Sequence, residues 1–210
     1  MHRWIRRAAI ALTALALIGS PDVAAAETQD DIVQRLRTSR DSERYEVPID
    51  GQSIKAGGAR ILINAPLPVV RTIIQDYARY QDFMPRFKRS RVVGQSEKAT
   101  QVYLQVPILH GAANVWSVVQ FNQPIKKPDG SEVIRGKMIQ GQGNVRDFRA
   151  TWFLVPIDAN TTLLRSEILI VPTLPVPGSV VTGELGYASD MAVTSTRNRA
   201  EAQVKDPAKK

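Results

Sequence analysis

The chain contains no cysteine and only two histidines, His2 and His110. Without cysteine no disulfide can form, so the hydrophobic core alone must stabilise the fold. The usual zinc sites need several cysteine or histidine ligands, and two histidines are too few to build one. His110 stands beside Gly111 in an expected loop, without a marked partner. The sequence therefore predicts no metal site, no cofactor and no recognisable catalytic centre.

Long apolar runs are also scarce, and the longest one, Ala8–Ile18, lies at the N-terminus. Arg3, Arg6 and Arg7 precede this run, and three alanines at positions 24 to 26 follow it. This order is typical of a secretory signal peptide. The run is shorter than the roughly 20 residues that a spanning helix needs. We therefore expect residues 1–26 to be cleaved and the mature protein to reach the periplasm of a Gram-negative envelope. An uncleaved membrane anchor is the alternative.

Negative charge is in deficit, since the formal net charge is +8 at pH 7. Loss of three arginines and one aspartate with residues 1–26 leaves +6. A basic exported protein is suited to anionic lipid headgroups or acidic partners, whereas nucleic acid is not expected outside the cytoplasm. A solvated surface with surplus lysine is the alternative interpretation.

One basic cluster is dense enough to suggest contact with an anionic membrane surface. It consists of Arg86, Lys88, Arg89 and Arg91. Two alternatives remain open for this cluster. Positive charge can protect a strand edge against aggregation, or Arg89 and Arg91 can serve a protein-interaction module at the envelope.

The first part of the mature chain alternates between helical and strand patterns. A helix is expected over 28–38, where Thr28 and Asp31 fit a capping box. Strands are expected over 45–49 and 59–64, separated by a tight turn at Asp50-Gly51. Pro66 and Pro68 then favour the start of an apolar-faced helix that runs towards Tyr77. A second short helix or turn follows and ends at Pro85.

From Phe87 onward the apolar period changes to two, which indicates strands. The expected strands are Phe87–Gly94, Gln101–Ile108, Ala113–Asn122, Glu132–Gln140, Val145–Val155 and Thr162–Val171. Short turns between them imply an antiparallel meander. After three prolines, residues 178 to about 203 carry a helical stripe of Val181, Leu185, Ala188 and Met191. We expect an α+β fold in which a curved antiparallel sheet wraps around this long C-terminal helix, with two short helices after the first core strand.

Several of these segments together resemble a known superfamily. The residues that carry the resemblance are Ala65-Pro66-Leu67-Pro68-Val69-Val70, Asp76, Tyr77, Tyr80, Phe83 and Pro85, the strand at 88–93, and Ala150-Thr151-Trp152-Phe153-Leu154-Val155-Pro156 with Thr161-Thr162-Leu163-Leu164. They are similar to the coenzyme-Q-binding and polyketide-cyclase branch of the START-like (SRPBCC) superfamily. The resemblance covers residues 57–203. It leaves 27–56 as an N-terminal helix and extension, and 204–210 as a charged tail. It implies the helix-grip fold, with a deep apolar cavity between sheet and helix.

Side chains expected on the inner faces are candidates to bind an apolar ligand. They are Phe83, Met84, Trp116, Met138, Phe148, Trp152, Leu164, Val181, Leu185 and Met191. Phe83 and Met84 would form a lid over the cavity. Trp116 is the weakest member, because Val115, Val119 and Phe121 compete with it for the inward face of their strand. The alternative is that these residues fill an ordinary solid core.

The pattern favours a monomeric, non-catalytic carrier or sensor of a lipid, isoprenoid or quinone-like molecule. A polyketide-cyclase-like or other small-molecule enzyme that uses the same cavity is the alternative function. His110, Ser166, Tyr103 and Tyr187 are the polar residues that such chemistry could use.

Overall fold

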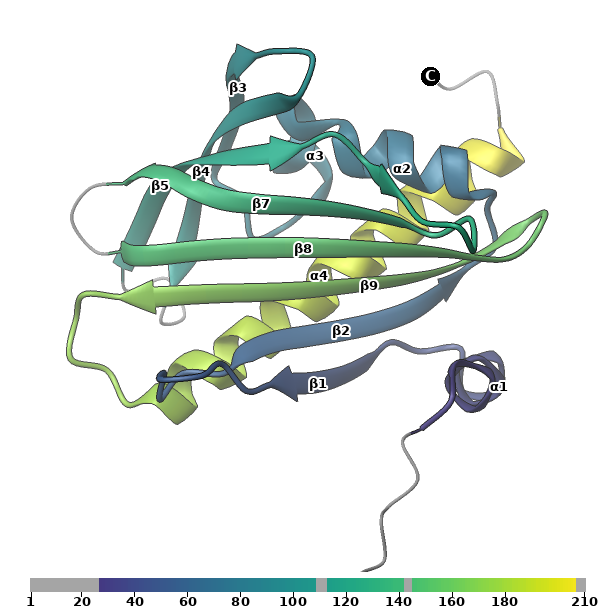
Figure 1. Cartoon of the computed structure of the whole chain (residues 1–210), viewed down its shortest axis with the longest axis horizontal. Coiled ribbons are helices and arrows are strands. Elements are labelled where there is room, and N and C mark those ends of the chain that lie inside the picture. The colour runs from purple at the N-terminus through teal and green to yellow at the C-terminus, as the bar shows by residue number, and fades with distance from the viewer. Residues whose placement is uncertain (1–26, 109–112, 142–144, 207–210) are drawn as a thin grey trace, which may run out of the picture.

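A computed structural model describes residues 27–108, 113–141 and 145–206 of the chain. Within those residues nine strands form one antiparallel sheet, in the order β1-β2-β9-β8-β7-β5-β4-β3, with β6 paired to β7. The strands are β1 (Glu43–Val47), β2 (Ala56–Ile63), β3 (Arg89–Gln95), β4 (Ala99–Ile108), β5 (Ala113–Asn122), β6 (Ile125–Lys126), β7 (Glu132–Gly141), β8 (Val145–Asp158) and β9 (Thr161–Pro172). The sheet is strongly curved, and β1 and β3 form its two edges (Figure 1).

The helices are α1 (Gln29–Ser39), α2 (Leu67–Gln75), η1 (Tyr77–Arg79), α3 (Tyr80–Phe83) and α4 (Gly178–Lys205). The long helix α4 crosses one face of the sheet diagonally, and α2 lies at one end of it (Figure 1). Pro68 lies in the first turn of α2, where a missing N–H costs no hydrogen bond. The predicted helix-grip architecture is therefore confirmed, including the two short helical segments after the strand β2.

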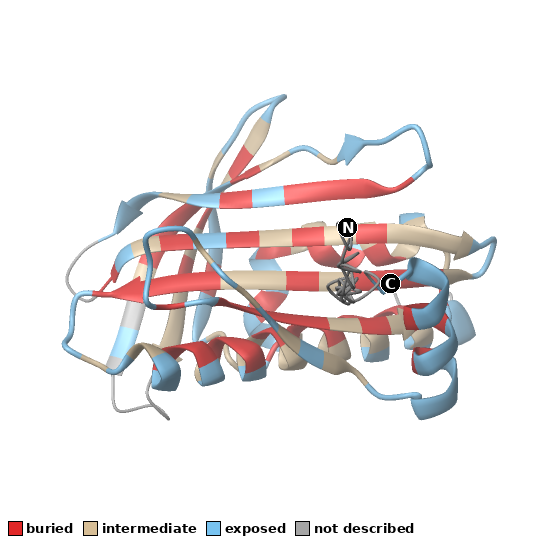
Figure 2. Ribbon diagram, turned by 60° about the horizontal axis from the view of Figure 1, so that its bottom comes forward, coloured by how far each residue is buried: buried red, intermediate tan, exposed pale blue. Residues whose placement is uncertain are grey.

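The main core lies between α4 and the inner face of the sheet. Alternate residues of β2 point into it, namely Ala59, Ile61 and Ile63. Figure 2 shows this alternation as bands of buried and more exposed residues along the strands. Strand residues two apart share a face, so the inner face is apolar while the intervening side chains reach the other side.

Helix α4 touches the strand β2 at backbone level. A Cβ atom built on Gly57 would lie 2.1 Å from the backbone nitrogen of Gly186 and 2.2 Å from the carbonyl carbon of Leu185. Only glycine fits at this crossing, because the Cβ atom of any other residue would clash with the backbone of the helix. The Ser189 hydroxyl donates to the Gly57 carbonyl at 2.8 Å, which fixes the helix along the strand.

Helix α1 covers part of the opposite face of the sheet. Its Ile32, Val33 and Leu36 form a second apolar cluster with Leu163 of β9. The expected capping box is present at its start, where the Asp31 backbone N–H donates to Thr28 Oγ1 at 3.3 Å and Asp31 Oδ2 accepts from the Thr28 N–H at 3.3 Å. The N-terminal extension is therefore packed on the sheet and, through β1, forms part of it.

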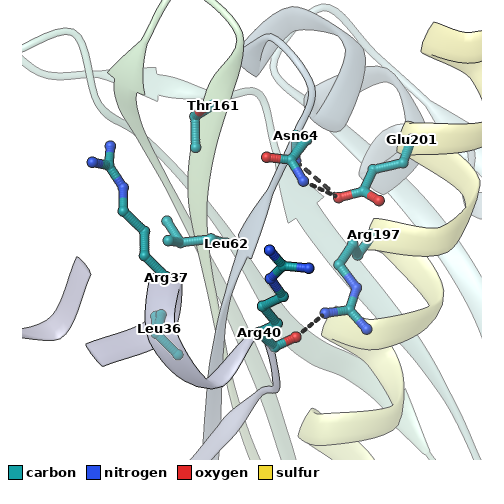
Figure 3. A pocket seen from close by; sticks show the side chains of 8 residues that line it. All are labelled: Leu36, Arg37, Arg40, Leu62, Asn64, Thr161, Arg197 and Glu201. Atoms are coloured by element: carbon teal, nitrogen blue, oxygen red, sulfur yellow. Dashed lines mark hydrogen bonds between the residues drawn. The ribbon is translucent and has the colours of Figure 1, made fainter. Parts of the chain in front are cut away.

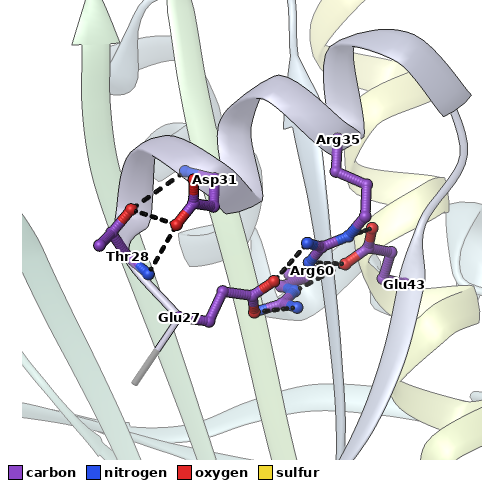
Figure 4. Close-up of polar contacts among 6 residues, drawn as sticks. All are labelled: Glu27, Thr28, Asp31, Arg35, Glu43 and Arg60. Carbon is purple, nitrogen blue, oxygen red and sulfur yellow. Dashed lines mark hydrogen bonds and ion pairs between the residues drawn. The ribbon is translucent and has the colours of Figure 1, made fainter. Parts of the chain in front are cut away.

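Four charged side chains tie α1 to the first two strands (Figure 4). Arg35 binds Glu43 with Nε–Oε1 at 2.6 Å and also contacts Glu27. Arg60 of β2 binds both acids, at 3.0 Å to Glu43 and 2.9 Å to Glu27. The hydrogen bond from Arg35, with further contributions from Arg60, holds the pKa of Glu43 below its usual range.

The crossing at Gly57 predicts a clear difference between two glycine-to-alanine changes. Gly57→Ala should destabilise the protein by about 3 kcal/mol, because the added methyl must displace helix backbone. Gly183→Ala on the exposed face of α4 meets no atom within 4 Å and should stabilise by about 1 kcal/mol through helix propensity. Chemical denaturation measures both values, and equal effects of the two changes would contradict this account of the crossing.

The network around α1 predicts an acid-sensitive contribution to stability. The pKa of Glu43 is lowered in the folded state, so its contribution is present above the unfolded pKa of about 4.3 and is lost as pH falls through the folded value. Glu43→Gln should lower stability by about 1 kcal/mol at pH 7, and the difference from wild type should shrink below about pH 4. Glu97→Gln, at an exposed turn, is the matched control and should change little. A Glu43→Gln deficit independent of pH would argue against the network.

Candidate functional site

A small apolar cavity lies between α4 and the inner face of the sheet. Its volume is about 60 Å³, and it is lined by Arg86, Phe87, Val106, Pro107, Phe148, Ile168, Ile170, Glu184, Leu185, Ala188 and Ala192. The alanines of α4 face larger side chains of β8 and β9, so the short side chains on the helix leave the space open. The volume exceeds the roughly 10–15 Å³ that one water needs and is well below the roughly 300–1,000 Å³ of typical ligand sites.

One wall of this cavity is charged. Arg86 Nη2 lies 2.7 Å from Glu184 Oε2, and both side chains are mostly shielded from solvent. Arg86 Nε is buried and has no hydrogen-bond partner among the described residues. The Tyr187 ring is contacted by the guanidinium groups of Arg86 and Arg44, at 5.3 Å and 5.1 Å from its centroid. The rest of the lining is apolar, so an ion pair flanks a hydrophobic recess.

The structure brings two of the expected ligand-binding residues to the cavity, Phe148 and Leu185. Met84, Trp152, Leu164 and Val181 are buried in the main core, and Phe83 and Met138 pack against that core. Met191 is half-buried on α4. Much of the expected set therefore forms solid packing around a recess that is smaller than the deep cavity expected from the resemblance.

Trp116 lies on the outer face of β5. Its ring stacks on Tyr103 with centroids 5.7 Å apart, whereas Val119 and Phe121 of the same strand belong to the core. The pairing with β4 explains this placement, because Val119 lies opposite Val102, which is also in the core. Val119 and Phe121, which competed with Trp116 for the inward face in the sequence, hold that face in the structure.

The segment beside the cavity is Arg86-Phe87 and not the expected lid of Phe83 and Met84. Met84 is only 2% exposed within the core. The Phe83 ring lies beneath the Arg199 guanidinium, 4.3 Å from the ring centroid to Cζ. Phe87 was not expected to line the site, since its strand-like pattern gave no sign that β3 begins only at Arg89. Of this stretch, Arg86 and Phe87 line the cavity, a few residues further along the chain than Phe83 and Met84.

The basic cluster divides in the structure. Arg86 turns towards Glu184 and the cavity, whereas Lys88, Arg89 and Arg91 are exposed around the start of β3. The Arg91 guanidinium lies over the Tyr103 ring at 5.7 Å. Three of the four residues expected to contact a membrane are thus accessible, and the fourth belongs to the cavity wall.

The polar residues considered for catalysis do not gather at the cavity. Ser166 is buried in β9, and Tyr103 stacks on Trp116. His110 lies outside the described residues. Burial raises the pKa of Tyr77 and of Tyr80, and the Tyr80 hydroxyl donates to the Ile74 carbonyl. Ser166 and Tyr103 lie outside the lining, as do Tyr77 and Tyr80. The Tyr187 ring packs against Arg86 of the cavity wall.

In the described part of the chain, no cluster of three or more histidine, cysteine, aspartate or glutamate side chains could hold a metal ion. None of the helices there combines the length and apolar character needed to cross a bilayer.

Residues 63–206 match the model of the family described as polyketide cyclase / dehydrase and lipid transport. The chain belongs to this family. The match runs from the last residue of β2 to just beyond α4, and it includes every residue that lines the cavity. No curated protein sequence matches the chain.

Solved structures share the START-like fold. A STAR-related lipid transfer protein from Xanthomonas axonopodis superposes with a TM-score of 0.66 at 16% identity, over 76% of this chain and 93% of that one. The lipid transfer and protein localization domain of human StarD13 superposes with a TM-score of 0.63 at 15% identity, over 80% of this chain and 96% of that one. The Zhui aromatase/cyclase from Streptomyces sp. R1128 superposes with a TM-score of 0.57 at 15% identity, over 80% of this chain and 98% of that one. At these identities the likeness establishes the fold alone.

Proposed function

We propose that the protein is a carrier or sensor that binds an apolar ligand, such as a lipid, an isoprenoid or a quinone-like molecule, between the sheet and α4. The observation that carries this proposal is the apolar recess formed by Phe148, Ile168, Ile170 and the small residues of α4. The family description, which includes lipid transport, and the lipid transfer proteins among the structural neighbours support it.

The size of the recess requires that it enlarge when the ligand enters. At about 60 Å³ it holds only a fragment of an acyl or isoprenoid chain. The Arg86-Phe87 segment is the part of the lining outside both the strands and α4, so its displacement is the simplest route to a larger space. Each CH₂ that leaves water contributes about 0.8 kcal/mol towards this opening.

Binding is favoured over the alternative cyclase-like chemistry. General acid–base catalysis needs a positioned group that can exchange a proton with the substrate. The titratable groups in the lining are Arg86 and Glu184, and they form an ion pair with each other. This pairing supports a role in closing the site or recognising a polar head, and an enzymatic role has no comparable observation behind it.

The proposal includes export and action as a monomer in the periplasm. The arginines, apolar run and alanines of residues 1–26 support removal of a signal peptide. The exposed Lys88, Arg89 and Arg91 would then attract the protein to anionic lipid headgroups, each worth about 1 kcal/mol near the surface.

Filling the recess should weaken binding while leaving the fold intact. Ala188→Leu places a larger side chain in the space beside Ile168 and Ile170 and should weaken uptake of a fluorescent polyene fatty acid or of ubiquinone by about tenfold or more. Ala202→Leu, at an exposed position of the same helix, is the matched control and should bind like wild type. Uptake unchanged in Ala188→Leu would contradict this site, as would purified protein that yields no apolar molecule on solvent extraction and mass spectrometry.

Processing of the N-terminus is a separate prediction. Expression of the full chain in a Gram-negative host should yield periplasmic protein whose intact mass starts at Glu27. A membrane-bound product that retains residues 1–26 would instead support the anchor interpretation.

A further inference from the structure

A second and larger hollow lies beside the last residues of β2, apart from the apolar cavity. Its volume is about 660 Å³, within the range of ligand sites. It is lined by Leu36, Arg37, Arg40, Leu62, Asn64, Thr161, Arg197 and Glu201 (Figure 3). None of these residues lines the apolar cavity, so the two sites are distinct.

The floor of the hollow is an open strand edge. Strand β1 pairs with β2 only from Ala56 to Arg60, so residues 61–63 have a strand neighbour on one side alone, which is β9. The Asn64 backbone N–H, on the open side, donates to Glu201 Oε1 at 3.0 Å. Peptide groups alternate sides along a strand, so those of Leu62, two residues before, also face the hollow. An unpaired strand edge is a template for a further strand.

Two basic side chains, Arg40 and Arg197, lie near each other at one end of the hollow (Figure 3). Arg197 Nη1 donates to the Arg40 carbonyl at 2.8 Å, and among the described residues neither guanidinium has a carboxylate within ion-pair distance. Arg40 has a left-handed backbone conformation with φ of 58°, which is uncommon for a residue other than glycine. Arg37 Nη2 lies 3.9 Å from Asp158 Oδ2, which is a long distance for an ion pair. This end of the hollow therefore has unneutralised positive charge.

The chain itself closes the end of the hollow at which Arg40 and Arg197 lie. The segment from Arg40 leads into β1, whose first residue Glu43 already pairs with Arg60. A new strand that pairs antiparallel with β2 would run in the direction of β1, from Asn64 towards Arg40. Its carboxyl end would then stop beside the Arg40 and Arg197 guanidinium groups.

We propose that this groove binds the carboxyl-terminal end of an extended peptide, which adds a short antiparallel strand beside Leu62 and places its terminal carboxylate between Arg40 and Arg197. Backbone hydrogen bonds to a strand edge give such sites affinity for peptides of varied sequence. Guanidinium groups match a carboxylate in geometry and charge, so they select a free chain end over an internal segment.

The test uses the purified protein on two arrays of random hexapeptides attached through their N-termini, one with free carboxyl ends and one with amide ends. The free-carboxyl array should bind at least about tenfold more protein. N-methylation of the backbone of the strongest binders should also weaken them, because it removes the N–H groups that the strand edge needs. Both changes are made to the peptide and leave the protein fold untouched.

Matched protein variants complete the test. The double change Arg40→Gln with Arg197→Gln should reduce binding to free carboxyl ends at least about tenfold, whereas Arg135→Gln, an exposed arginine on β7, should not. Equal binding to both arrays, absence of binding to either, or full binding by the double variant would overturn the proposal. Calorimetry in which succinate binds as tightly as the best peptide would also overturn it, because a bare anion would then suffice.

Discussion

The contact on which the rest of the structure depends is the direct approach of α4 to β2 at Gly57. Because helix backbone lies against strand backbone there, α4 is held close to one edge of the curved sheet. The sheet curves away from the helix towards β4 and β8, where side chains must fill a widening space. Phe148, Ile168 and Ile170 line this space, and opposite them the short Ala188 and Ala192 leave part of it open as the apolar cavity. The position of the cavity thus follows from where the helix and the sheet diverge.

The N-terminal segment makes this edge of the sheet asymmetric. Strand β1 protects the first half of β2, and α1 packs on the outer face through Leu36 and Leu163. The chain between them crosses the edge at Arg40. The second half of β2 therefore pairs with β9 on one side and has no strand neighbour on its outer side. The edge of β2 therefore borders the larger surface hollow with its basic side chains, whereas the small apolar cavity lies between α4 and the inner face of the sheet.

Local patterns were enough to predict the elements, because each depends on a few neighbouring residues. The capping box at Thr28, the helix start at Pro68 and the alternating strands are examples. The site was less predictable, since it depends on contacts between distant segments. Gly57 lies before the strand expected at 59–64, and only the structure shows that α4 packs against it. The inward face of β5 was ambiguous until its pairing with β4 was known. Phe87 lines the cavity only because the chain turns between α3 and β3.

The balance of energies at the cavity favours a ligand that opens its own site. Opening the cavity would separate Arg86 from Glu184, whose side chains are 23% and 17% exposed to solvent. Because water can reach the separated charges, the free-energy cost of breaking this ion pair stays moderate. Breaking a partly shielded charged hydrogen bond costs about 1.5–3 kcal/mol. Four buried CH₂ groups contribute about 3 kcal/mol, which offsets that cost. Short apolar molecules would therefore gain little, whereas a long acyl or isoprenoid chain gains with every further methylene. A small recess that must widen is consistent with selection for long ligands by this mechanism.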